Sequence, residues 1–319
     1  MEKKILSAAF VLLFVALTSC NNENDALPVS DGEMSIAAHI EGAASTRADK
    51  FDWEENDRLG VFVCDATIDQ PYLGNPSRYT NVLFKHNGKG FFAQHVYLDE
   101  NPAEVFAYYP YDVNSTTGSA IPIESTTQTD YLYGHSDTPA SITHKNVTIR
   151  MKHALSQVVF KLRKSAAYNE GDCLLQALTI ENNDANNVFK TAGTLNLSTG
   201  DITGTSIDGV LALIPGSTLL LTEEYQKVSS ICFPVTATAG KNIKAVFTID
   251  NRQFRYEFPV GTTWAPGYRN IYTLTVTNSS VDIGGDGDGD GTSDDGITIE
   301  PWTDNKDSDI SCLLYTSDA

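Results

Sequence analysis

Short segments in which apolar and polar residues alternate recur along this chain and limit its fold more than any other feature. Clusters of Gly, Pro, Asn, Asp and Ser separate them; examples are residues 35–40, 59–63, 104–109, 147–151, 157–162, 177–180, 210–214, 244–249 and 271–276. A period of two with β-branched and aromatic residues is typical of β-strands. Long stretches of helical period are nearly absent, and residues 156–168 form the one arguable helix. The sequence therefore predicts an all-β fold, most simply two β-sandwiches in tandem.

Turn-rich stretches divide the 319 residues, which are enough for two domains of ordinary size. The turns over 133–146 mark the expected boundary, which gives an N-terminal sandwich over 35–146 and a C-terminal sandwich over 147–278. A Gly- and Asp-rich linker is expected over 279–296, and a C-terminal strand over 297–311. This last strand has no partner near it in sequence, so it has to pair on its own sheet or on that of a neighbouring molecule.

The N-terminus has the pattern of a lipoprotein signal. Lys3 and Lys4 precede an apolar run over 5–17, and small residues stand directly before Cys20. A positive start, an apolar run too short to span a membrane and a small-residue cut site are typical of a secretory signal peptide. We therefore expect a signal peptide over 1–20, acylation of Cys20 (palmitate, for example), anchorage to the outer membrane, and a flexible tether over 21–34. The alternative is a plain signal peptide with an incidental cysteine.

Charge and cysteine content limit the partners and the covalent structure. The formal net charge of -19 argues against nucleic acid as a partner, because nucleic-acid binding needs a basic face. Cys64, Cys173 and Cys232 have no metal-like spacing, and both a Cys173–Cys232 disulfide and buried free thiols remain open. The last eight residues, 312–319, resemble a translated sequencing adapter. We expect this tail to be foreign to the protein and to take no part in its fold.

The acidic linker contains a weak candidate for a calcium site. Asp286, Asp288 and Asp290 stand at positions one, three and five of an EF-hand-like pattern, with Gly291 at position six. The twelfth position falls on Ile297, where such a loop needs a bidentate glutamate. A solvated, extended linker is therefore the favoured interpretation, and no metal is expected.

No motif of this chain points to catalysis. His135, His144 and His153 recur every nine residues, but no carboxylate or thiol cluster joins them, so we expect structural histidines. A Gly-x-Ser-x-Gly elbow, a phosphate loop and a zinc-protease helix are all absent from the sequence. We expect a protein that is not an enzyme and that uses no cofactor.

Several motifs, in this order, resemble the fimbrillin-like lipoprotein family, which includes subunits and anchors of the type V pili of Gram-negative anaerobes. Each motif is short, but their order together with the lipoprotein signal makes the resemblance strong, and it covers residues 35–277. The motifs are Trp53-Glu54-Glu55-Asn56-Asp57-Arg58-Leu59-Gly60-Val61-Phe62, Ala107-Tyr108-Tyr109-Pro110-Tyr111, Met151-Lys152-His153-Ala154-Leu155-Ser156-Gln157-Val158, Gly193-Thr194-Leu195-Asn196-Leu197-Ser198-Thr199-Gly200 and Trp264-Ala265-Pro266-Gly267-Tyr268-Arg269.

The resemblance implies two transthyretin-like, Greek-key sandwiches and a surface fimbrium that assembles by strand exchange. In such pilins a protease cuts after a basic residue beyond the first strand, and an extended segment of the next subunit fills the groove that opens. The matching cut here lies between Arg47 and Ala48, after a first strand expected over 35–41. The matching donor is the C-terminal strand, with Ile297, Ile299 and Trp302 as groove fillers.

Each of these assignments has an alternative. Arg47 could be an ordinary solvated arginine, and an anchor subunit would keep its first strand and its lipid. The segment 297–302 could fold back as an edge strand of its own domain. The expected partners are other pilus subunits, the outer membrane and a host or bacterial surface ligand. The rival function is a monomeric outer-membrane lipoprotein that binds glycans through Trp53, Trp264, Tyr108, Tyr109 and Tyr111. A β-sandwich hydrolase has no positive support.

Overall fold

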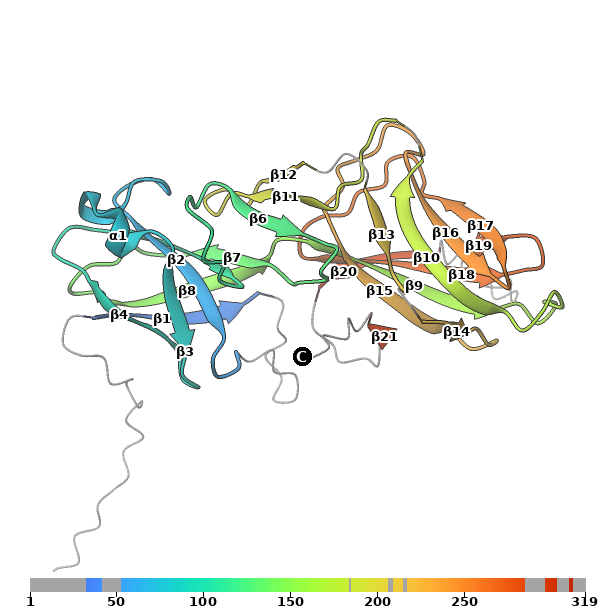
Figure 1. The fold of residues 1–319 in the computed structure, drawn as a ribbon, viewed down its shortest axis with the longest axis horizontal. Coiled ribbons are helices and arrows are strands. Elements are labelled where there is room, and N and C mark those ends of the chain that lie inside the picture. Colours follow the sequence, from blue (N-terminus) through green and yellow to red (C-terminus); the bar gives the residue numbers. More distant parts are fainter. Residues whose placement is uncertain are drawn as a thin grey trace, which may run out of the picture.

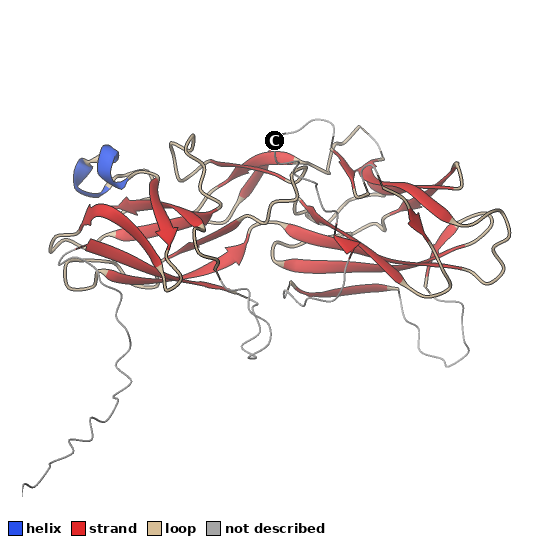
Figure 2. Cartoon of the chain, turned by 60° about the horizontal axis from the view of Figure 1, so that its bottom comes forward, coloured by secondary structure: helices blue, strands red, loops and turns tan. Residues whose placement is uncertain are grey.

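The computed structural model describes residues 33–41, 53–183, 185–205, 209–214, 217–284 and 296–302, and the backbone of 310–311. These residues form an elongated molecule of two lobes that consist almost entirely of β-strands (Figures 1 and 2). The predicted all-β fold class is confirmed. The helical structure of the described part is a 3-10 turn, η1 (Tyr72–Gly74), and one turn of α-helix, α1 (Pro76–Tyr79). Within the same part, no helix has the length and apolar character needed to cross a membrane.

Seven strands of the first lobe close into a barrel in the order β1-β4-β3-β2-β5-β7-β8. Strict alternation explains this arrangement: along β8, Val147, Ile149 and Met151 are buried in the barrel core, while Thr148 and Arg150 are exposed. The strands are β1 (Glu33–Ile40), β2 (Arg58–Cys64), β3 (Val82–His86), β4 (Phe91–Tyr97), β5 (Glu104–Tyr109), β7 (Leu132–His135) and β8 (Asn146–His153).

The second lobe is a sandwich of two sheets around an aromatic core. Phe160 of one sheet meets Phe247 of the other edge to face, with 5.6 Å between ring centroids. The first sheet has the order β13-β10-β16-β17, with β14 also on β10: β10 (Leu174–Asn182), β13 (Val210–Ala212), β14 (Leu219–Leu220), β16 (Ile243–Ile249) and β17 (Arg252–Glu257). The second has the order β19-β18-β9-β15-β21, with β20 also on β18: β9 (Ser156–Lys164), β15 (Gln226–Cys232), β18 (Tyr268–Val276), β19 (Val281–Ile283), β20 (Ile297–Pro301) and β21 (Ile310–Ser311).

A small third sheet joins the lobes. It has the order β12-β11-β6, so that β6 (Ile121–Glu124) from the first half of the chain pairs with β11 (Ala192–Leu195) from the second, and β12 (Ile202–Gly204) follows. Side chains of this sheet enter a separate buried cluster with residues of both lobes: Ile123 and Leu195 pack there together with Phe62, Phe106 and Phe233. The two lobes are thus connected by a shared core as well as by the chain.

The expected domain boundary at residue 146 differs from the sheet arrangement. Residues 147–153, which the sequence analysis assigns to the second sandwich, lie in β8 and close the barrel against β1 and β7. The change from barrel to sandwich therefore falls between β8 and β9. The physical reason is that β8 pairs in parallel with β1, a strand more than a hundred residues earlier, and its local pattern carries no trace of this pairing.

The fold also decides two open expectations from the sequence, one for the segment 156–168 and one for the cysteines. The segment expected as a strand at 157–162 lies in β9 (Ser156–Lys164), which β15 and β18 flank, so the arguable helix over 156–168 is not formed. Cys64, Cys173 and Cys232 are buried free thiols, so the structure contains the second of the two alternatives for the cysteines. Burial raises the pKa of the Cys64 thiol to about 12, with nearby aspartates adding to the shift. Burial likewise raises the pKa of Cys173 to about 11.

Candidate functional site

The strand β1 closes the barrel, because it lies between β4 and β8 and pairs with both. It pairs in parallel with β8 over six residue pairs, from Ser35↔Asn146 to Ile40↔Met151, and antiparallel with β4 on its other side. Met34, Ile36, Ala38 and Ile40 are buried in the barrel core, while the intervening Ala37 and His39 are exposed. An observed strand at 33–40 agrees with the first strand expected over 35–41. Every second side chain of β1 is thus a part of the core.

Trp53, the first described residue after Glu41, contacts β1. Trp53 donates a hydrogen bond from its indole Nε1 to the carbonyl oxygen of Ala38 at 2.8 Å. Its ring also meets Phe91 and Tyr109 edge-on, with 5.0 Å and 5.4 Å between centroids. This explains the tryptophan of the first resemblance motif, because its indole covers the outgoing end of β1.

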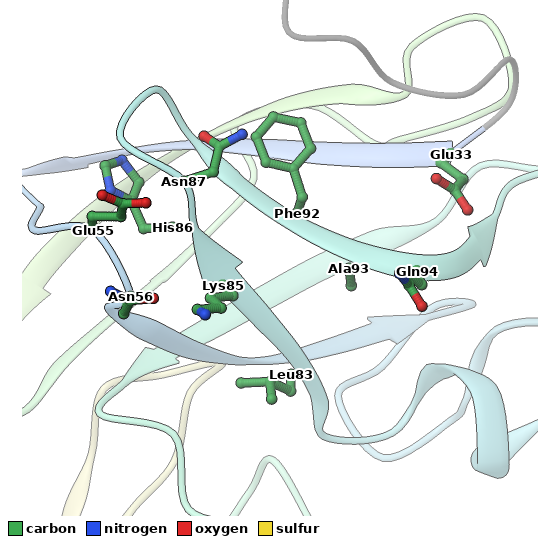
Figure 3. Close-up of a pocket in the computed structure, with 10 residues that line it drawn as sticks. All are labelled: Glu33, Glu55, Asn56, Leu83, Lys85, His86, Asn87, Phe92, Ala93 and Gln94. Atoms are coloured by element: carbon green, nitrogen blue, oxygen red, sulfur yellow. The ribbon is translucent and has the colours of Figure 1, made fainter.

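A groove of mixed polar and apolar lining opens near the other end of β1, where β3 and β4 separate (Figure 3). The two strands pair at Lys85↔Phe92 and His86↔Phe91, next to their hairpin turn, and then diverge. The groove has a volume of about 600 Å³, and Glu33 and Gln94 line it along with Lys85 and Phe92. It lies beside the path of β1 because Glu33 is the first residue of that strand.

Glu33 fixes the wide bulge of β4 that borders this groove. Its carboxylate accepts hydrogen bonds from the backbone N–H of His95 at 3.0 Å and from the hydroxyl of Tyr97 at 3.2 Å. The hydrogen bond to Glu33 raises the pKa of the Tyr97 hydroxyl above its ordinary value. His95 itself has a φ of 66°, in the left-handed region, so the bulge is held in an unfavourable backbone conformation.

The predicted C-terminal strand is present and pairs within its own chain. β20 lies antiparallel to β18, from Tyr268↔Pro301 to Tyr272↔Ile297. Of the three proposed groove fillers, Ile297 packs against the sandwich core, Trp302 is buried, and Ile299 is 59% exposed. The structure therefore contains the edge-strand arrangement that the sequence analysis gives as the alternative.

The remaining candidate site residues and the histidines singled out in the sequence have separate outcomes. Cys20, Arg47, Ala48, Asp286, Asp288 and Asp290 lie outside the described residues. Within the described part, no three His, Cys, Asp or Glu side chains gather as a metal would need, and His135, His144 and His153 do not converge.

The aromatic residues of the rival glycan-binding function are largely core residues. Trp264 and Tyr108 are fully buried, and the Trp264 indole donates to the Tyr272 hydroxyl at 2.9 Å. Trp53 and Tyr109 are partly buried and pack on the barrel core. A row of exposed rings for sugar stacking is not formed by these five residues in the described part of the chain.

One contact that sequence reasoning missed joins the C-terminal segment to the barrel. Trp302 stacks on His153, the last residue of β8, with 4.4 Å between ring centroids and 16° between planes. The sequence treated His153 only as a structural histidine and Trp302 only as a donor residue. No local signal could have paired them, because they approach one another only through the packing of the lobes.

Comparison with known proteins agrees with this fold. The model of the fimbrillin-like family matches residues 46–302, and the chain belongs to this family. The fold is also that of a proposed cell adhesion protein of Bacteroides uniformis (20% identity, TM-score 0.61, covering 86% of this chain and 100% of that one). A proposed cell adhesion protein of Bacteroides ovatus (18%, TM-score 0.59, 87% and 100%) and a fimbrial protein of Bacteroides vulgatus (13%, TM-score 0.54, 85% and 100%) are similar. No curated protein matches the chain.

Family membership defines the class of protein. The family is one of fimbrial and adhesive structural proteins and not a family of enzymes, so this chain is a subunit of a pilus or an adhesin at the cell surface. Proteins of this class assemble with other subunits. The resemblance of the sequence motifs to fimbrillins is thereby confirmed.

Proposed function

We propose that this chain is a structural or adhesive subunit of a type V pilus, exported as a lipoprotein through Cys20 and assembled by donor-strand exchange. The observation that supports this most is the position of β1. It supplies Met34, Ile36, Ala38 and Ile40 to the core, yet it lies at the N-terminal end of the described chain. A single cut in the stretch 42–52 would therefore separate a whole wall strand from the barrel.

Loss of β1 would leave the barrel with a groove that favours another strand. The facing edges of β4 and β8 would lose their ladder partner, and a row of apolar side chains would meet water. An extended segment with alternating apolar residues restores both the main-chain hydrogen bonds and the core, which is the physics of β-strand addition. We assign the cut to the bond between Arg47 and Ala48.

The donor in this proposal is the C-terminal segment with Ile297, Ile299 and Trp302. To donate, the segment has to leave β18, where it is held by five residue pairs and by a salt bridge of 3.5 Å between Arg269 and Glu300. The exposed side chain of Ile299 is consistent with a donor strand, because this apolar residue is not buried within its own chain. A role in adhesion to a host or bacterial surface, like the lipid anchor, remains a prediction.

An arginine-specific protease tests the assignment of the cut. The purified precursor should yield one fragment boundary between Arg47 and Ala48 and then form multimers that resist SDS. Arg47→Gln should abolish both. Lys50→Gln is the matched control, because Lys50 lies three residues further on and such a protease does not cut after lysine. Multimers that form equally well from the Arg47→Gln protein, or none after a clean cut, would exclude this mode of assembly.

A further inference from the structure

The C-terminal segment contacts both lobes. Through β20 it belongs to the sandwich, and the backbone N–H of Trp302 continues this attachment by donating to the carbonyl oxygen of Gly267 at 2.7 Å. The indole of Trp302, however, lies flat on His153 of the barrel strand β8. Only 5% of Trp302 is exposed. One side chain therefore links the candidate donor strand to the wall of the barrel.

The imidazole that receives this indole is held in place from its edge. His153 is buried, and its Nδ1 lies 2.9 Å from Oδ1 of Asp130. Its backbone pairs with Leu132 of β7. These contacts fix the ring so that one face is available for stacking, which adds to the stability gained by burying the indole.

The outgoing end of β1 meets the same place. Glu41 donates its backbone N–H to the carbonyl oxygen of Met151 at 2.8 Å, two residues before His153 along β8. Glu41, Lys152 and Trp302 line one pocket of about 250 Å³. The end of β1, from which residues 42–52 lead away, and the end of the C-terminal segment thus lie against the same final residues of β8.

We propose that Trp302 is a latch that couples the two strands involved in assembly. While it is stacked on His153, it holds β20 on its own sandwich and supports the end of β8 to which β1 is bound. When β1 is removed, β8 loses a partner along six residue pairs, its end becomes easier to open locally, and the hold on Trp302 weakens. Because coupling between two sites is reciprocal, release of Trp302 also loosens the end of β1. The use of this latch in pilus assembly rests on the proposed function, whereas the coupling is a property of the single chain.

Hydrogen exchange of the uncut monomer, followed by mass spectrometry, tests the coupling. In Trp302→Ala, exchange in β20 should rise about tenfold, which corresponds to losing one aromatic pair. Exchange at Ile40 and Glu41, at the far side of β8, should rise in the same variant. Trp302→Phe keeps a stacking ring and should restore slow exchange at both places. Thr298→Ala is the matched control: it shortens an exposed side chain of the same strand and should leave exchange at Ile40 and Glu41 unchanged.

The reverse experiment uses the cut protein. After cleavage at Arg47 and removal of the released strand, exchange in β20 should be faster than in the uncut chain, and Trp302→Ala should abolish the difference. Unchanged exchange at Ile40 and Glu41 in Trp302→Ala, or an equal rise in Thr298→Ala, would refute the latch. These measurements need no polymer, so they remain decisive if multimers never form. Normal multimers without coupling would overturn the latch and leave the proposed function intact.

Discussion

The ring of Tyr108 lies so close to Gly60 that a Cβ on this glycine would stand 2.0 Å from Cε1 of the ring. The two residues face one another across the β2–β5 ladder, and the Tyr108 hydroxyl donates to Oδ1 of Asn81 at 2.8 Å. The glycine of the segment Leu59-Gly60-Val61 and Tyr108, the first tyrosine of the segment Tyr108-Tyr109-Pro110, therefore form one packing unit. This gives a physical reason for two motifs that the sequence analysis could only match by resemblance.

Gly60→Ala should destabilise the protein by about 1–3 kcal/mol, because a new methyl group has to displace the buried ring. Urea unfolding measures this change. Gly240→Ala is the control, since a Cβ there would meet its nearest side-chain atom at 3.6 Å, an ordinary contact distance. If both variants unfold at the same urea concentration, the close approach of Tyr108 is not a constraint on residue 60.

Ile36→Ala should cost about 3 kcal/mol of folding stability, because it removes a buried side chain from the barrel core and leaves a cavity. His39→Ala, at an exposed position of the same strand, should change stability by less than about 0.5 kcal/mol. The free energies of unfolding of the uncut protein decide the matter. Equal effects at the two positions would mean that β1 does not contribute alternate side chains to the core.

Asp250 should make the second lobe sensitive to acid. Partial burial opposes ionisation, but hydrogen bonds from Leu174 N–H, the Tyr168 hydroxyl and Cys173 N–H, together with the charge of Arg252, hold the pKa of this carboxyl below its ordinary 3.8. A pKa that folding lowers contributes stability that is complete above the unfolded value. That stability is lost as the pH falls through the folded value.

Asp250→Asn should therefore be less stable than the parent protein at pH 7, and its stability should fall less steeply below pH 3.8. Urea unfolding at a series of pH values between 7 and 2 measures both effects. Parallel pH profiles for the two proteins would show that Asp250 is not a source of the acid sensitivity.

The three buried thiols, Cys64, Cys173 and Cys232, should not react with thiol reagents in the folded protein. Burial suppresses the thiolate by raising the pKa of Cys64 to about 12 and that of Cys173 to about 11, and it also raises the pKa of Cys232. In a Cys20→Ser, Cys312→Ser background, a thiol reagent at pH 8 should find no reactive group until denaturant is added, and then three. Fewer than three in denaturant would reveal a disulfide that the structure lacks.

Local pattern was sufficient to predict many of the longer strands, because in a strand with one buried face every second residue is apolar. Residues 244–249 and 271–276 are examples that the structure contains as β16 and β18. β9 was ambiguous since Val158, Val159 and Phe160 are all buried, and a strand covered on both faces loses its period of two. Fold class was therefore within reach of sequence reasoning, and the ambiguous segment was the one at the centre of a sheet.

Pairing between strands that are distant in sequence could not be predicted from local pattern. Val147–Met151 alternates in the same way whether it closes the barrel or opens the sandwich, and only its parallel contact with Ala37 and Ala38 decides. The C-terminal segment was predicted as a strand, but its choice of β18 and the contact of Trp302 with His153 depend on how the lobes pack. For the candidate site, sequence reasoning named the two strands that the proposed mechanism uses and missed the contact of Trp302 with His153.

The small sheet that β6 and β11 share has a mechanical consequence for a protein of this class. In the proposed assembly the groove lies in the barrel and the donor strand on the sandwich, so tension between neighbouring subunits has to cross between the lobes. It can cross through the covalent chain at Ala154 and Leu155 and, alongside it, through the β6–β11 ladder. The four residue pairs of this ladder therefore share with the covalent chain any force that acts between the lobes.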